Sequence, residues 1–311
     1  MAKLDYSGLT EGICRAFQKK GFVTQIFDTK KYRKIDKYIK KDFSFKKFQI
    51  FLQEFSPDIV FLVAPLFLKK EYYEIIKNYK KRKDCKTIGW IGDSFENITE
   101  NEERLSIFDF LYYTDTGFFK IHTASNVEYL PLATDEQIFY FENSEGRKRY
   151  NCSFVASQTK ERSSFLKLIK NKVNILGPGW VRGDDLNKLH SVNRCKLSIG
   201  KVAKIYSQSE IVLNLKNENN VIDGLNQRSF DPCAAGSVLV HDYVKDIELN
   251  YEIGEEVLVF RSAEEFDNLY EMLIKDSNFK KKISKNGQKR VLSCHTFEKR
   301  ADKIISDIKS L

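Results

Sequence analysis

Short apolar runs alternate along the chain with longer segments in which apolar residues recur at helical spacing. Runs of about four to seven mostly apolar residues are typical of strands that are buried in a parallel sheet. In the first part of the chain the expected strands are residues 22–27, 59–64, 87–93, 108–113 and 127–132. Residues 10–20 have helical spacing instead, with Ile13 and Phe17 on one face and Gly21 after the last turn. This alternation predicts a parallel α/β fold.

The same alternation resumes after a polar stretch. Residues 131–150 have few apolar positions at regular spacing, and residues 142–149 are polar apart from Gly146. Beyond them, strands are expected at residues 152–155, 173–176, 211–215, 238–241 and 257–260, and three helices after Ser262. We therefore predict a first domain at residues 1–140, a second at residues 141–295, and a final helix at residues 296–311.

The start of the first domain departs from this scheme. A nucleotide-binding type of domain usually begins with a strand before its first helix, and residues 1–9 offer only a poor strand. Two explanations stay open: the first strand is very short, or residues that precede it are missing from the sequence.

Composition restricts the class of protein. The 311 residues suffice for two domains, and 42% hydrophobic residues are ordinary for a globular chain. No apolar run approaches the ~18–20 residues of a membrane span, and no signal-peptide pattern opens the sequence, so we expect a cytoplasmic protein. The six cysteines have no C-x-x-C pair and no metal-type spacing to the four histidines. We expect reduced thiols and no structural zinc.

The net charge of +9 raises the question of a nucleic-acid partner. The lysines are spread over many segments, however, and no zinc finger, RNP-type pattern or basic zipper accompanies them. Solvated helix faces explain most of them. A basic surface also suits an anionic acceptor glycan, an acidic partner or an anionic membrane leaflet at the inner face of the membrane, and these three stay open. No nucleic-acid partner is expected.

The most informative segment is residues 223–236. It places Asp223 and Asp231 eight positions apart and begins with a glycine turn, Gly224-Leu225-Asn226. An apolar run precedes it and another follows it, which predicts a strand–turn–helix–strand unit with a helix ending near Gly236. Backbone N–H groups at the head of such a helix would suit a phosphate. A carboxylate one or two turns further on would suit a sugar or ribose hydroxyl, so the expected ligand is a sugar nucleotide.

At this segment the sequence resembles a known family. Residues 223–236 (Asp-Gly-Leu-Asn-Gln-Arg-Ser-Phe-Asp-Pro-Cys-Ala-Ala-Gly) are similar to the nucleotide-sugar segment of CgeB-like glycosyltransferases, which are relatives of the large retaining GT-B group with its Glu-x7-Glu motif. Asp223 and Asp231 stand at the two acidic positions. Further motifs occur in the order of the family: 154–157 with Glu161-Arg162, 176–180, 206–207, 213–215, 255–256, and 295–297 with Arg300. The resemblance covers the C-terminal half well and the N-terminal half thinly.

The resemblance implies an architecture and roles for both acids. It implies two Rossmann-like domains facing each other across a cleft, with the last helix crossing back to the first domain. Asp231 would bind the ribose hydroxyls, and Asp223 the transferred sugar. From the residues alone, a short acid at a helix start is otherwise an ordinary cap. That alternative is weaker for Asp231, which is expected well inside the helix, where Asp is a poor helix former.

Basic residues would neutralise the leaving diphosphate. Arg228 lies in the glycine turn and could clamp phosphate with its guanidinium, or it could be a surface arginine paired with Asp223 or Asp231. Lys160 and Arg162 follow the strand at residues 152–157, where the first turn of the second domain should face the ligand, and a plain solvated helix start is the alternative.

Further candidates lie at other strand ends. Asp93 follows Gly92 at the carboxyl end of a strand and is the candidate general base or acceptor-positioning group, with a helix cap as the alternative. Asp115 is a second-tier candidate by the same logic. Trp180 could stack on the nucleotide base or simply pack. His295 is expected to be structural. No P-loop or dinucleotide fingerprint is present, which counts against a dehydrogenase.

These observations predict a glycosyltransferase that moves a sugar from a nucleotide-diphosphate donor to a glycan, lipid-linked glycan or protein, in surface-polysaccharide or related assembly. Retention of anomeric configuration and independence from metal or another cofactor are expected, because Arg228 and a helix dipole can replace a metal at the diphosphate. In a retaining enzyme the leaving phosphate can deprotonate the acceptor; in an inverting one Asp93 would be the base. The alternative is a non-catalytic GT-B-like module that binds glycan or nucleotide, which the Asp pair in place of a Glu pair leaves open.

Overall fold

The computed structural model divides the chain into two compact units. It describes residues 8–29, 31–32, 36, 38, 42–92, 102–141, 148–180, 185–218 and 221–309. Unit 1 consists of residues 1–131, 218–224 and 300–311, and unit 2 of residues 132–217 and 225–299. The chain thus leaves unit 2 for the short segment 218–224 and returns. The functional boundaries expected at residues 140 and 295 stay a prediction.

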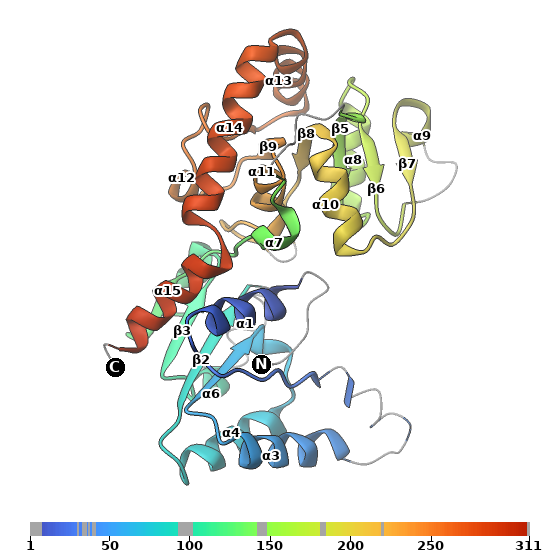
Figure 1. Ribbon diagram of the computed structural model, residues 1–311. Helices are drawn as coiled ribbons and strands as arrows, with labels where there is room; N and C mark the ends of the chain where they lie inside the picture. The colour runs from blue at the N-terminus through green and yellow to red at the C-terminus, as the bar shows by residue number, and fades with distance from the viewer. Residues whose placement is uncertain are drawn as a thin grey trace. The chain divides into compact units, whose positions relative to one another are not determined.

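Unit 1 is built on a parallel sheet of four described strands in the order β1-β2-β3-β4 (Figure 1). The strands are β1 (Ile59–Val63), β2 (Lys86–Ile91), β3 (Phe110–Tyr113) and β4 (Val127–Tyr129). The other elements of this part of the chain are α1 (Leu9–Lys19), α3 (Phe43–Phe55), η1 (Pro65–Phe67), α4 (Lys70–Lys80), α6 (Glu102–Leu105), η2 (Thr116–Lys120) and most of α15 (Phe297–Ile308). Four of the five predicted strands are confirmed.

The strand expected at residues 22–27 is wrong. Residues 22–26 have no strand pairing, and only Phe27 occupies a single bridge position. The apolar residues of this segment come in adjacent pairs and do not alternate, so they do not form one buried face. Val23 is accordingly 85% exposed. The question of a strand before α1 concerns residues 1–7, which lie outside the described residues.

Buried aromatic residues and α15 hold unit 1 together. Trp90 of β2 is 1% exposed, and its indole N–H donates to the carbonyl of Leu130. From α15, Arg300 donates to the carbonyl of Pro131, and Asp307 accepts from the hydroxyl of Tyr112 in β3. The last helix therefore packs on the β3–β4 side of the first sheet.

Unit 2 contains a six-stranded parallel sheet in the order β10-β9-β8-β5-β6-β7 (Figure 1). The strands are β5 (Tyr150–Val155), β6 (Asn174–Leu176), β7 (Ser191–Asn193), β8 (Ser209–Asn214), β9 (Val238–Asp242) and β10 (Leu258–Phe260). The other elements are α7 (Glu136–Phe139), α8 (Lys160–Leu168), α9 (Leu186–Leu189), α10 (Ile199–Ser207), η3 (Gln227–Ser229), α11 (Asp231–Ala234), α12 (Ile247–Asn250), α13 (Ala263–Lys275) and α14 (Ser277–Cys294). All five strands predicted here are confirmed, and β7 is additional.

Both faces of the second sheet are covered. Ile211 and Leu213 point into one apolar cluster, which includes Phe154 and Phe266, whereas Val212 points into the other with α11 and α14. Side chains alternate between the faces of a strand, so a strand that is buried on both faces is apolar throughout.

The strand order also locates a switch point. From β5 the chain continues outward to β6 and β7, and then returns to the opposite side of β5 with β8, β9 and β10. Adjacent loops after β5 and β8 therefore turn in opposite directions at the carboxyl ends of these two strands. In open parallel sheets, ligands bind at this position.

Candidate functional site

Two arginines meet at the switch point of unit 2. Arg162 comes from α8, which follows β5, and Arg228 comes from η3, which follows β8. The Nη2 atom of Arg162 donates to the carbonyl of Leu215 at 3.2 Å, and Nη2 of Arg228 reaches the same carbonyl at 3.4 Å. Leu215 is the first residue after β8. The two guanidinium groups thus converge on one backbone oxygen at the carboxyl end of the sheet.

Arg162 is buried, and only some of its guanidinium nitrogens have hydrogen-bond acceptors among the described residues. The hydroxyl of Thr159 caps α8 by accepting from the backbone N–H of Arg162. Nη1 donates to the carbonyl of Ser157 at 3.0 Å, and the residue is 5% exposed. Its buried Nε has no partner among the described residues. Burial and the positive charge of Arg228 lower the pKa of Arg162.

Arg228 is half-buried and directed by Asn214. Its Nε donates to Oδ1 of Asn214 at 3.1 Å, and burial lowers its pKa. Within the described part of the chain, Arg228 forms neither of the ion pairs with Asp223 or Asp231 that the surface-arginine interpretation requires. Guanidinium groups stay protonated in proteins, so both pKa shifts express an electrostatic cost. A bound anion would relieve that cost.

Asp231 lies beside this pair at the start of α11. It is 5% exposed, and the hydroxyl of Thr134 donates to its Oδ1 at 2.8 Å. Burial raises its pKa well above the usual range, and nearby Asp135 adds to the shift, whereas Arg228 opposes it. A carboxyl group held in this way can exchange hydrogen bonds with hydroxyl groups of a ligand.

The helix expected to end near Gly236 is much shorter than predicted. Residues 227–229 form a 3-10 turn, and α11 contains only Asp231–Ala234. Asp231 is its first residue and is not well inside it, because Pro232 has no N–H to donate and therefore stands at a helix start. A four-residue helix has too few aligned peptide groups for the predicted phosphate pocket at its head. The two arginines provide the positive charge at this position.

Asp223 and Gly224 belong to unit 1. The backbone N–H groups of Ile222 and Asp223 donate to the carboxylate of Asp115 at 2.8 and 3.0 Å. Asp115 also accepts from the N–H of Gly117, and Lys120 forms an ion pair with Asp223 at 2.6 Å. A Cβ atom on Gly224 would lie 2.6 Å from Cβ of Asp115, so glycine permits this close approach. The Asp pair of the sequence motif is therefore divided between the two units.

Other predicted site residues take different positions. Lys160 is exposed at the start of α8. Trp180 is 4% exposed, donates its indole N–H to the carbonyl of Ala156, and packs edge-on against Phe154, which favours packing over stacking on a base. Leu225 is a core residue, and Asn226 accepts from the side chain of Asn214. Asp93 lies outside the described residues.

A buried polar network behind Arg228 was not predicted. Asn214, Ser229 and His241 are fully buried and hydrogen-bonded to one another. Asn214 lies in a predicted buried strand and in the motif at residues 213–215, and no hydrogen-bonding role was predicted for it. A polar side chain in such a strand must find partners, and this requirement was a signal available in the sequence.

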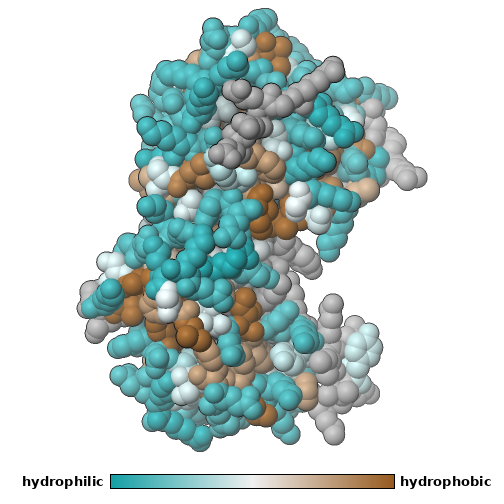
Figure 2. All heavy atoms as spheres, in the orientation of Figure 1, coloured by the Kyte–Doolittle hydropathy of each residue, from teal (hydrophilic) through white to brown (hydrophobic). Residues whose placement is uncertain are grey.

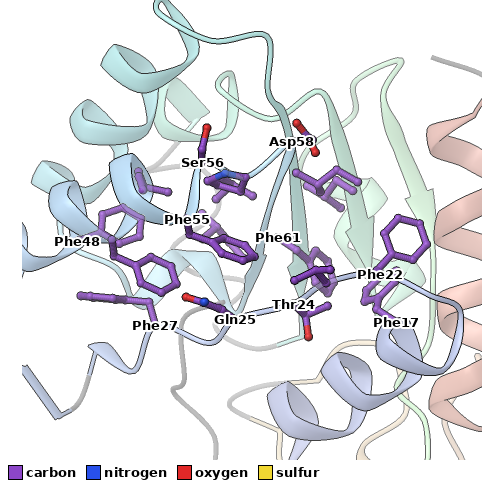
Figure 3. Close-up of a pocket in the computed structure, with 18 of the residues that line it drawn as sticks. Phe17, Phe22, Thr24, Gln25, Phe27, Phe48, Phe55, Ser56, Asp58 and Phe61 are labelled. Carbon is purple, nitrogen blue, oxygen red and sulfur yellow. The ribbon is translucent and has the colours of Figure 1, made fainter.

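A cavity of unit 1 is a separate feature. It has a volume of about 460 Å³ and lies along β1 and α3 (Figure 3). Phe17 and Phe22 stand at one end and Phe27 and Phe48 at the other. None of its described lining residues is basic, and Asp58 is the charged one. It therefore lacks the cations that a diphosphate requires, and Figure 2 shows apolar side chains on this unit's surface as well.

Comparisons with known proteins bear on the family and the fold. Residues 157–306 match the family described as "Glycosyl transferase-like". A glycosyltransferase from Rickettsia africae is 11% identical over 100% of this chain and 96% of its own, with a TM-score of 0.67. Anabaena HepE in complex with UDP is 10% identical over 86% and 82%, with a TM-score of 0.65. Sucrose-phosphate synthase from Thermosynechococcus elongatus is 11% identical over 86% and 76%, with a TM-score of 0.62.

Domain and fold together support a glycosyltransferase. The fold is of the GT-B type, with two Rossmann-like α/β domains that each contain a parallel sheet. None of the curated proteins matches the sequence, so the narrower CgeB-like resemblance stays a prediction. No helix in the described ranges has the length and apolar character needed to cross a bilayer.

Proposed function

We propose that the protein transfers a sugar from a nucleoside-diphosphate donor, and that Arg162 and Arg228 bind the diphosphate. The observation that carries this proposal is the convergence of both guanidinium groups on the carbonyl of Leu215. When the bond to the sugar breaks, negative charge accumulates on the leaving diphosphate. Fixed cations at that place stabilise the transition state more than the ground state.

A uridine nucleotide is the first donor to test. Anabaena HepE, a structural neighbour, has been determined with UDP and with UDP-glucose. In this chain we propose that Asp231 binds ribose hydroxyls beside the diphosphate, since it is the acid closest along the chain to Arg228 and lies in the same unit. Asp223 stays a candidate for the transferred sugar, and the backbone of 224–226 and Lys160 for further donor contacts.

The finer chemistry is also part of the proposal. Two guanidinium groups supply positive charge at the diphosphate, which supports turnover without a metal. Retention of configuration would let the leaving phosphate accept the proton of the acceptor hydroxyl. The acceptor is a glycan, a lipid-linked glycan or a protein, and the basic surface suits an anionic acceptor or membrane leaflet. If the product anomer is inverted, Asp93 becomes the candidate base.

Binding of free nucleotides tests the first step. Thermal unfolding, followed by circular dichroism, should be measured with UDP, GDP, CMP, ADP and dTDP. A nucleoside diphosphate at ~100 times its dissociation constant stabilises the fold by about 2.7 kcal/mol. Stabilisation by one diphosphate and not by its nucleoside is expected. If no diphosphate stabilises the fold, the proposal is contradicted. Binding of a sugar nucleotide without turnover would favour the non-catalytic module.

The role of Asp231 has its own test. Asp231→Ala is expected to weaken UDP binding by about 1.5–3 kcal/mol, the scale of a hydrogen bond to a charged group. Uridine alone should lose a similar amount, because the ribose is common to both ligands. Unchanged affinity of a folded variant in calorimetry would remove Asp231 from the site.

A further inference from the structure

A chain of buried polar groups leads from Arg228 into the second sheet. Oδ1 of Asn214 accepts from Nε of Arg228 at 3.1 Å. Nδ2 of Asn214 lies 2.9 Å from Nε2 of His241, and Oγ of Ser229 lies 2.8 Å from the same nitrogen. Asn214, Ser229 and His241 are each 0% exposed. The mechanism proposed above uses Arg228 and leaves these groups without a role.

The direction of each hydrogen bond follows from chemistry. A guanidinium only donates, so Asn214 must turn its amide oxygen to Arg228 and its amide nitrogen to His241. An amide nitrogen only donates, so Nε2 of His241 carries no proton. Nδ1 of His241 lies 2.6 Å from the backbone oxygen of Asp242, which only accepts, so Nδ1 carries the proton. One arrangement satisfies all three bonds: Nε2 accepts and Nδ1 carries a proton, with the carboxylate of Asp242 also 2.9 Å from Nδ1.

We propose that His241 is a positioning residue that orients Arg228 through Asn214. If the amide of Asn214 rotated by half a turn, its N–H groups would face the guanidinium and its oxygen would face the lone pair of Nε2. The imidazole is the nearest of three acceptors around the amide nitrogen, at 2.9 Å, with Ser229 Oγ at 3.1 Å and Asn226 Oδ1 at 3.3 Å. It therefore helps to fix the amide, and the amide directs Nε of Arg228. The remaining N–H groups of the guanidinium are left to face the anion. This inference rests on the proposed diphosphate site.

Coupling between His241 and Arg228 is the decisive measurement. His241→Phe keeps a ring of similar size and removes the acceptor at Nε2. We expect UDP affinity in calorimetry to fall on the order of tenfold, the scale of one lost hydrogen bond to a charged group. In an Arg228→Ala background the same change should cause no further loss, because the residue that it orients is gone.

His190→Phe is the matched control. His190 is also a buried histidine of unit 2, bonded to the N–H of Val173 and the carbonyl of Leu166, away from Arg228. UDP affinity should be unchanged in this variant. An equal loss from His241→Phe with and without Arg228 would show that His241 acts only on the structure and would overturn the inference.

Two further results are distinguished from failure of the inference about His241: loss of the diphosphate site itself, and a His241→Phe variant that does not fold. A wild-type protein that binds neither UDP nor inorganic pyrophosphate would contradict the diphosphate site itself, and the inference with it. If His241→Phe does not fold, the wild-type protein still gives a test, because long-range ¹⁵N–¹H correlation spectra at neutral pH distinguish the two tautomers. A proton on Nδ1 alone is expected. A proton on Nε2 would overturn the arrangement.

Discussion

The two units use charge at their strand ends in opposite ways. In unit 1, the carboxylate of Asp115 after β3 accepts hydrogen bonds from three backbone N–H groups, and Lys120 forms an ion pair with Asp223. In unit 2, Arg162 and Arg228 follow β5 and β8 and donate to the same carbonyl. Burial lowers the pKa of both, and the charge of Arg228 lowers that of Arg162 further. A charge with all its partners present stabilises a loop. Two arginines that converge on one backbone carbonyl suit an anionic ligand, although the negative charge of Asp242 acts on both of them.

The largest expected effect comes from removing both arginines. Arg162→Ala combined with Arg228→Ala should weaken UDP binding by about 3–6 kcal/mol, because two charged hydrogen-bonding groups are lost. Arg228→Lys alone should cost nearly as much as Arg228→Ala, since an ammonium cannot reproduce the planar fork. Calorimetry with UDP and with uridine measures both.

Lys167→Ala, an exposed charge change on α8, is the control for this pair. Equal losses for UDP and for uridine would show that the arginines are structural, and the contrast with unit 1 would then disappear.

Unit 1 should respond in stability. Asp115 is 2% exposed, and Asp115→Ala leaves three backbone N–H groups without their acceptor. We expect the free energy of unfolding to fall by about 2–3 kcal/mol. Asp115→Asn keeps the shape but turns one oxygen into a donor, so most of the loss should remain. Urea unfolding measures both variants.

Asp58→Ala gives the same charge change in unit 1 at an exposed side chain, and it should stay within about 0.5 kcal/mol of wild type. A stable Asp115→Ala protein that has lost only UDP binding would place Asp115 in the ligand site.

The pH dependence of stability sharpens the comparison at Asp231. Its folded-state pKa is raised, so the folded protein binds more protons than the unfolded chain between the two values. The stability from this group is therefore present below about pH 3.9, the unfolded value, and is lost as the pH rises through the folded pKa. Asp231→Asn should be more stable than wild type at neutral pH and change less with pH. Urea unfolding between pH 5 and 7.5 tests this, and an identical pH slope would contradict it.

The smallest effect on binding is expected at Trp180. Trp180→Phe loses the bond to the carbonyl of Ala156 and some packing, at a cost of about 1–2 kcal/mol in unfolding free energy. UDP affinity should stay within about a factor of two, because the ring lies in the core. A tenfold loss of UDP affinity would instead support stacking of Trp180 on the nucleotide base.

Most of the fold could be predicted because its strands are buried on both faces. Ile59–Val63 is a continuous apolar run, and β8 contains the run Ile211-Val212-Leu213, and such runs predict buried strands. Residues 22–27 have a similar composition, but no described strand pairs with residues 22–26. Pairing depends on residues distant in sequence, which local composition does not specify.

The site could be predicted in part. The positions of Arg162 and Arg228 after strands of the second domain could be predicted, and their role in binding stays a prediction. The division of Asp223 from Asp231 could not be predicted, because it depends on Asp115, more than a hundred residues away in the chain. The length of α11 was overestimated, although Pro232 was visible in the sequence.

The phenylalanine-lined cavity beside β1 affects how the protein can be studied. Its lining includes Phe22, 38% exposed, and Val23, so apolar surface is accessible in the folded state. Environment-sensitive dyes such as anilinonaphthalene sulfonate, which are used to detect loosened cores, should bind there and fluoresce with the native protein. A bright dye signal from this protein is therefore no sign of partial unfolding.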